Sequence, residues 1–153
     1  LFRSSAASDV YKRQGKHCEV KKQKLLDQNA LWRNVYVSET DSQAEDELYE
    51  FLIDTRKHMM EIRSELNPND FEPLPETLNA WTDPAVSHEE GARMAMETGS
   101  LYGCTKKVKE QVAELKELGV CHLLCQTGFG AMDMEQNISS MRRFGEEVIP
   151  SFS

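Results

Sequence analysis

A short apolar run between two helical patterns constrains the fold of this chain more than any other feature. Residues 120–126 read VCHLLCQ, and a Thr-Gly-Phe-Gly tetrapeptide follows directly. One helical pattern ends at Gly119 just before the run, and another begins at Asp133 behind it. Such a run is typical of a strand buried on both faces, as in parallel sheets. The glycines are expected to mark a loop at the carboxyl end of the strand, where α/β proteins bind ligands.

Strands and helices alternate through the rest of the readable sequence, which predicts an α/β fold with a parallel sheet. The three strands are expected to be parallel neighbours, with the intervening helices on the outer side. A sheet of three strands has two open edges, so either further strands lie upstream or the chain oligomerises. The predicted elements are a strand at 31–38, a long helix at 44–66, an irregular segment at 67–84, a short helix at 87–97, a strand at 100–102, a helix after Thr105, a strand at 120–126 and a helix from Asp133 to Pro150.

The predicted helices have recognisable starts and apolar stripes. The segments at 40–43 and 87–90 have capping-box spacing, and Thr105 is the expected N-cap of the next helix. Residues that recur at steps of three and four are expected to face the core. They are Ala44, Leu48, Leu52, Thr55, Met59, Ile62 and Leu66 in the long helix, and Ile138, Met141, Phe144 and Val148 in the last helix.

The charge of the chain excludes two classes of partner. There are 18 Lys and Arg residues against 26 Asp and Glu residues, which gives a net charge of −8. The acidic residues are spread along predicted helix faces, so we expect no nucleic-acid partner and no membrane partner. No apolar run approaches the roughly 20 residues of a membrane-spanning helix, and the N-terminus lacks the apolar core of a signal peptide. These patterns favour a cytoplasmic protein.

The cysteines do not form a metal-binding pattern. No two of them make a Cys-x-x-Cys pair, although Cys121 and Cys125 both belong to the apolar run. In a strand these two side chains lie on the same face, while His122 lies on the opposite face. Free cysteines are commonly buried as small hydrophobic residues. We therefore expect no metal site.

The first residues differ in character from the rest of the chain. Residues 1–14 show no periodicity that continues beyond residue 14, and they resemble translated adaptor sequence. We expect this segment to be non-native and to pack against nothing. The domain is expected to occupy residues 15–153, with its natural start further upstream.

From about residue 30 onward the ordered motifs resemble a known family. The motifs are RNVYVSETDSQAE, then LYGCTKKVKEQVAELKELGVCHLLCQTGFG, and finally MEQNISSMRRFGEEVIPSF. Together they are similar to the C-terminal portion of luciferase-like flavin-dependent monooxygenases. The resemblance implies a (β/α)8 TIM barrel, which usually takes about 250 residues. This chain would then hold roughly the last three strands with their outer helices.

The resemblance also implies an activity. The parent protein would use reduced FMN, or in some branches a deazaflavin, together with oxygen to oxidise a small organic substrate. Its partners would be that substrate and the missing N-terminal part of the same barrel, and the parent is expected to be a homo-oligomer. The fragment alone is expected to be inactive, because a barrel site is built from the loops of all eight strands.

The candidate site is the loop after the last predicted strand. By the barrel resemblance this loop lies on the active-site face, so its residues are expected to line a cofactor or substrate site. They are Gln126, Thr127, Gly128, Phe129 and Gly130. A phosphate is not expected there, because Asp133 at the start of the next helix would repel it. A plain turn is the alternative for the glycines, and no catalytic residue is assigned.

A second function belongs to a different class. The chain would then be a self-contained small α/β protein-interaction module without catalytic activity. Its long helix at 44–66 would present the partner surface, and Gly-Phe-Gly would be only a turn. Sequence upstream of Lys16 distinguishes the two hypotheses, because several further strand-helix units in frame would exclude the module.

Overall fold

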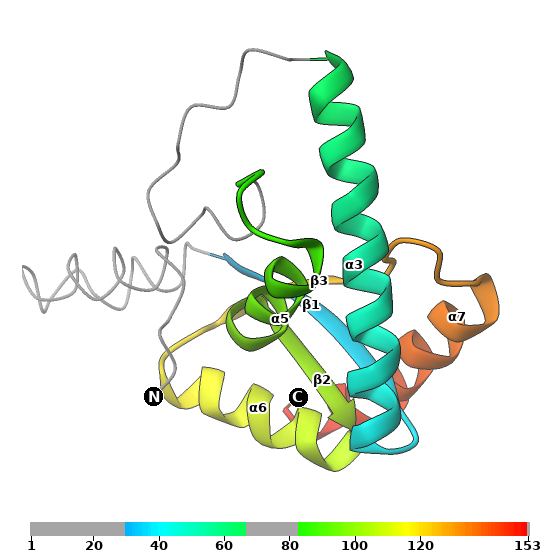
Figure 1. The fold of residues 1–153 in the computed structure, drawn as a ribbon. Coiled ribbons are helices and arrows are strands. Elements are labelled where there is room, and N and C mark those ends of the chain that lie inside the picture. Colours follow the sequence, from blue (N-terminus) through cyan, green and yellow to red (C-terminus); the bar gives the residue numbers. More distant parts are fainter. Residues whose placement is uncertain (1–29, 67–82, 153) are drawn as a thin grey trace, which may run out of the picture.

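The structure is a computed structural model, and it describes residues 30–66 and 83–152 (Figure 1). The expected boundary at residue 14 and nearly all of the irregular segment at 67–84 lie outside this part of the chain. The described elements are β1 (Ala30–Ser38), α3 (Asp41–Leu66), α5 (His88–Gly99), β2 (Ser100–Cys104), α6 (Thr105–Glu117), β3 (His122–Gln126), α7 (Met134–Arg143), a π-helical turn η1 (Phe144–Val148) and a 3-10 turn η2 (Ile149–Ser151).

The three strands form one parallel sheet, which confirms the predicted α/β class. Their order is β2-β1-β3, so the first strand in the sequence lies in the centre. In a closed barrel consecutive strands are neighbours, and β2 would take the central place. The sheet described here is open and has the strand order found in doubly wound α/β folds.

The two outer strands pair with different halves of β1. The first half pairs with β3, from Ala30 opposite His122 to Asn34 opposite Gln126. The second half pairs with β2, from Asn34 opposite Ser100 to Ser38 opposite Cys104. The sheet is therefore staggered, with Asn34 as the only β1 residue in register with both neighbours.

Helices cover both faces of the sheet. The expectation that the intervening helices lie on one outer side is therefore wrong. On one face Tyr36 packs with residues of α3 and α5, including Leu48, Leu52 and Met96. On the other face Val35 and the rest of a second cluster pack with α6 and the C-terminal turns; its other buried members are Val37, Leu101, Val108 and Val148. The reason is the strand order, because the chain moves one way from β1 to β2 and back across β1 to reach β3. Connections of one hand then place their helices on opposite faces.

The long helix follows its predicted stripe only where it covers the sheet. Thr40 caps it, since its Oγ1 accepts a hydrogen bond from the Gln43 backbone N–H at 3.1 Å. Leu48 is buried, but Met59 is 52% exposed and Ile62 is 39% exposed. A helix of 26 residues is about 39 Å long, so its second half projects beyond the sheet (Figure 1).

The last helix buries a different stripe from the predicted one. Val148 is buried and Phe144 packs against the core, as expected, but Ile138 and Met141 are 45% and 50% exposed. Ser140 is buried instead, because its Oγ accepts a hydrogen bond from the Val37 backbone N–H at 2.8 Å. Among the described residues no strand neighbours this edge of β1 beyond the end of β3, and α7 satisfies the backbone group there.

The predicted helix starts are largely confirmed. Ser87 caps α5, with its side chain accepting from the Glu90 backbone N–H, and Asp133 forms a complete capping box with Gln136 at the start of α7. The expected N-cap of α6 is wrong by one residue. Cys104 occupies that position without a side-chain cap, and Thr105 donates its hydroxyl to Glu147 at 2.7 Å.

Candidate functional site

The carboxyl ends of the three parallel strands point to one edge of the sheet, but they do not end at one level. Gln126, at the end of β3, is opposite Asn34 in the middle of β1. Four further residues of β1 extend the strand by about 13 Å past that level. The candidate loop therefore lies beside the middle of β1, and α7 occupies the edge beyond it.

The five predicted site residues divide into two groups. Gln126 ends β3, and its side-chain Nε2 donates to the Gly128 carbonyl oxygen at 3.3 Å, while Thr127 is half-buried between them. Phe129 is only 4% exposed and belongs to the core cluster that includes Leu52 of α3. The aromatic ring thus fixes the loop to α3. The side chains of Gln126 and Thr127 and the backbone of Gly128 are the parts left for a ligand.

Gly130 shows why the loop needs glycine. Its φ is +41°, and a Cβ there would lie 2.7 Å from the Phe51 carbonyl oxygen and from the Asp54 side chain. The backbone of Gly130 thus lies directly against α3. Gly128 has no comparable constraint, since its nearest neighbour would be the Asn137 side chain at 3.5 Å.

The start of α7 is closed to anions. The Asp133 carboxylate accepts from the Gln136 backbone N–H at 2.7 Å, and the Gln136 side chain accepts from the Asp133 backbone N–H at 3.3 Å. A carboxylate at the positive end of a helix repels a phosphate and occupies a donor that the phosphate would need. The absence of a bound phosphate at this helix start stays a prediction.

Asn137, on the same helix, is a polar residue that the sequence did not single out. Its Oδ1 is buried and has no hydrogen-bond partner in the described part of the chain. A buried acceptor without a donor costs about 1–3 kcal/mol. The amide lies against Gly128, so it brings an unsatisfied polar group to the candidate loop.

A second polar cluster lies at the carboxyl end of β1. The Tyr36 hydroxyl donates to Glu47 at 2.7 Å, and the Ser38 hydroxyl and the Gln43 side-chain amide donate to the same carboxylate. Burial raises the pKa of Tyr36, and the hydrogen bond to Glu47 raises it further. Because three donors satisfy the carboxylate, the cluster fixes β1 to α3 and provides no free base.

At the carboxyl end of β2 the polar groups also bond to neighbouring elements of the protein. The Asp41 carboxylate accepts from the Cys104 backbone N–H at 2.7 Å, and this bond lowers the pKa of Asp41. Gly103 lies between them with a φ of +141°, where a Cβ would be 2.7 Å from the Lys107 side chain. The contact joins the starts of α3 and α6.

The described residues contain no group of three or more histidine, cysteine and acidic side chains that could hold a metal ion. In the same part of the chain no helix is long and apolar enough to cross a membrane. Cys121 and Cys125 lie at the surface outside any disulfide of the described residues, and the Cys121 Sγ donates to the Gly119 carbonyl oxygen at 3.6 Å; Cys104 is partly buried. The chemistry available at the loop is therefore hydrogen bonding by an amide, a hydroxyl and backbone groups.

The sequence matches no protein-family model, and no curated protein matches it.

Proposed function

We propose that the chain is the C-terminal part of a luciferase-like flavin-dependent oxidoreductase. The observation that carries the proposal is the parallel sheet, which places the Gln126–Gly130 loop at a strand carboxyl end and α7 directly behind it. Ligands of parallel α/β folds bind at these ends. The motif resemblance adds the cofactor class to this placement.

A barrel origin is supported by one half of the sheet. β1 and β2 are consecutive and adjacent, and α3 and α5 pack on one face of them. Their other face carries Val35, Val37 and Leu101, branched residues of the kind that fill barrel interiors. Here Val108 and Val148 cover that face. In the complete barrel we expect upstream strands to supply this cover and β3 to pair with β2.

The loop suits the ring of a flavin better than its phosphate. Gln126 and Asn137 offer amides, Thr127 offers a hydroxyl, and Asp133 opposes an anion. The polar edge of an isoalloxazine ring has both donors and acceptors for such groups. When bound, the flavin supplies the redox chemistry, and these residues orient the ring and limit the access of water.

The experiment extends the chain upstream in its own reading frame and titrates it with FMN by fluorescence. We expect the extended protein to bind FMN and the 153-residue chain to bind weakly or not at all. Thr127→Ala should weaken binding by the extended protein about tenfold, since it removes one hydrogen bond. Thr98→Ala is the matched control, because that hydroxyl donates to the Met94 carbonyl at the opposite edge of the sheet.

Two outcomes contradict the proposal. One is upstream sequence that contains no further strand-helix units. The other is an extended, folded protein that does not bind FMN. Equal weakening by both threonine variants would place the flavin away from the loop.

The interaction module is the second candidate function, and the projecting end of α3 favours it. Met59 and Ile62 are exposed on one stripe of the helix, in a region that does not cover the sheet. The same upstream sequence decides between the two functions. An open reading frame that begins close to Lys16 would support the module.

A further inference from the structure

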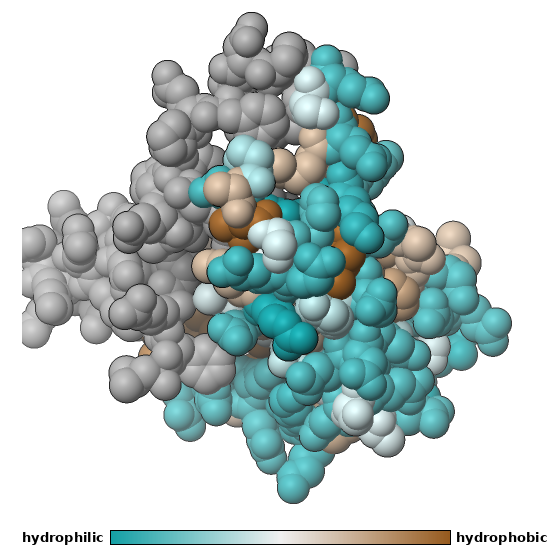
Figure 2. Space-filling model, viewed as in Figure 1, coloured by the Kyte–Doolittle hydropathy of each residue, from teal (hydrophilic) through white to brown (hydrophobic). Residues whose placement is uncertain are grey.

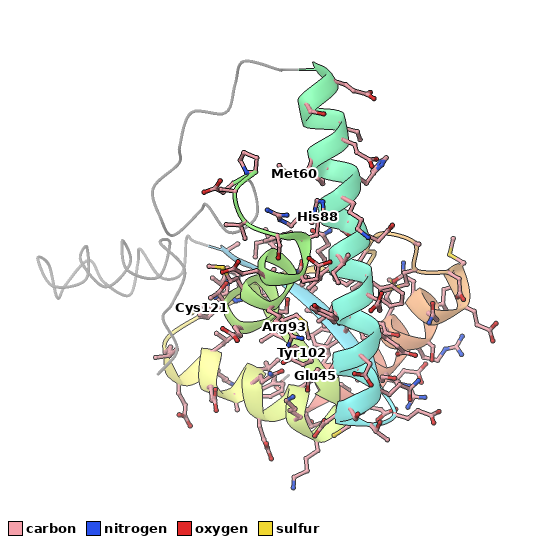
Figure 3. The ribbon with its side chains drawn as sticks, viewed as in Figure 1. Glu45, Met60, His88, Arg93, Tyr102 and Cys121 are labelled. Carbon is pink, nitrogen blue, oxygen red and sulfur yellow. The ribbon has the colours of Figure 1, made fainter. Side chains whose placement is uncertain are left out.

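Arg56 is the largest of the fully buried side chains and lies at the junction of α3 with the start of α5. It is 1% exposed. Its guanidinium donates to the backbone carbonyls of Asp83 at 2.8 Å and Val86 at 2.9 Å, and it lies 3.0 Å from His88 Nδ1. Figure 3 shows His88 at the beginning of α5, beside α3. One side chain thus holds the segment that leads into α5.

The contact with His88 fixes the protonation state of the imidazole. A guanidinium has only donors, so His88 Nδ1 must accept the hydrogen bond through its lone pair. The neutral imidazole therefore carries its proton on Nε2. A second proton would occupy the lone pair on Nδ1 and place two cations in contact at a partly buried site.

The charges around this pair come from three elements. Asp83 of the preceding segment and Glu89 of α5 both act on Arg56, and Lys57 of α3 acts with His88 on Glu89. The two carboxylates oppose the effect of burial, which lowers the pKa of Arg56. They reduce the repulsion that a charged His88 would meet, but they cannot restore the lost acceptor.

We propose that the Arg56–His88 hydrogen bond is a pH-sensitive latch, closed at neutral pH and released when His88 takes up a proton. Release leaves Arg56 bonded to the Asp83 and Val86 carbonyl oxygens and loosens only the first turn of α5, where Ser87 accepts from the Glu90 and Gly91 backbone N–H groups. The buried residues of α5 that lie further along the helix, Ala92 and Met96, keep their packing against α3. The opening is thus local and does not require the core to unfold.

The test measures amide hydrogen exchange of Glu90 and Gly91 in the whole chain at about pH 7.5 and about pH 5.5. After correction for intrinsic exchange rates, protection should fall about tenfold on acidification, the size expected for a lost buried hydrogen bond to a charged group. His88→Asn is the matched variant, because its side-chain oxygen replaces the Nδ1 acceptor and does not titrate. Its protection should be nearly independent of pH.

The two proteins share every other titratable group, so the difference between them isolates His88. An equal fall in the two proteins, or no fall in the wild type, overturns the latch. The nitrogen chemical shifts of His88 give a test that needs no variant. At neutral pH they should show the proton on Nε2, and a proton on Nδ1 would overturn the proposal.

Discussion

The two halves of β1 differ in burial, although they belong to one strand. In the half that pairs with β2, Val35 and Val37 are at most 2% exposed, whereas Trp32 in the half that pairs with β3 is 53% exposed. The outer strands follow the same division, since Leu101 of β2 is buried and Leu124 of β3 is 55% exposed. Helices on both faces cover the first pair, and they leave much of the second uncovered.

The residues that stabilise the fold and the residues of the candidate site therefore lie in different halves of the sheet. The β1–β2 half contains the buried clusters that hold α3, α5 and α6 on the sheet. The β1–β3 half carries the Gln126–Gly130 loop and has little apolar burial of its own. The face seen in Figure 2 is mainly hydrophilic along α3, as expected where the buried side of this helix turns toward the sheet. The loop is held mainly through Phe129, which reaches the core of the better-packed half.

The largest expected effect comes from replacing a leucine by alanine in each half of the sheet and comparing the two losses of stability. Leu48→Ala removes a fully buried side chain from the core and should lower the free energy of unfolding by about 2–5 kcal/mol. Leu124→Ala changes a side chain that is mostly exposed and should cost less than about 1 kcal/mol. Urea denaturation measures both. Similar losses would show that the β3 half is packed as well as the β2 half.

The next prediction asks whether the candidate loop depends on its contact with α3. Gly130→Ala places a Cβ against the Phe51 carbonyl and strains a positive φ, so it should cost about 1–3 kcal/mol. Gly128→Ala meets only the Asn137 side chain at 3.5 Å and should be nearly neutral. Thermal unfolding of the two variants gives the comparison. A greater loss for Gly128→Ala would mean that the loop is held from the α7 side.

The third prediction concerns α7, which accepts a hydrogen bond from the edge of β1 beyond the end of β3. Ser140→Ala leaves the Val37 backbone N–H without its acceptor and should destabilise the protein by about 1–2 kcal/mol. Ser139→Ala, one residue earlier on the same helix, is the control and should change little. Equal values in urea denaturation would show that water replaces the serine at this edge.

The sequence predicted what depends on local patterns. The three strands, the caps at Ser87 and Asp133, and the buried start of the long helix follow from periodicity and capping chemistry over a few residues. The strand order did not follow, because it is set by which helices pack on which face. The apolar pattern of β1 would be the same in any strand order, so it does not indicate which strands lie beside β1.

The burial of particular residues was missed for the same reason. Ser140 looks like a surface position, and it is buried because a distant backbone N–H needs an acceptor. Arg56 lies on a charged helix, and it is buried because three acceptors from the segment at 83–88 surround it. Phe129 is predicted to line the candidate site, and its side chain packs in the core cluster with Leu52 of α3, which the local sequence did not indicate. Each of these depends on contacts between residues far apart in the sequence.

The smallest expected effect tests whether the polar cluster at the end of β1 adds to the stability of the better-packed half. Tyr36→Phe removes the hydrogen bond to Glu47, which keeps its bonds from Ser38 and Gln43, so the loss should be about 0.5–1.5 kcal/mol at neutral pH.

The dependence of this loss on pH identifies its cause. The pKa of Tyr36 is raised in the folded protein, chiefly by burial and then by Glu47. Above about pH 10 the unfolded chain releases this proton while the folded protein keeps it, so the wild type loses stability as pH rises. Tyr36→Phe lacks that proton, and the other tyrosines titrate in both proteins. The difference in unfolding free energy should therefore be full below about pH 10 and shrink above it. A difference that stays constant would show that the Tyr36 hydroxyl releases its proton at the same pH in the folded and unfolded protein, so that the hydrogen bond to Glu47 is not the cause of the loss.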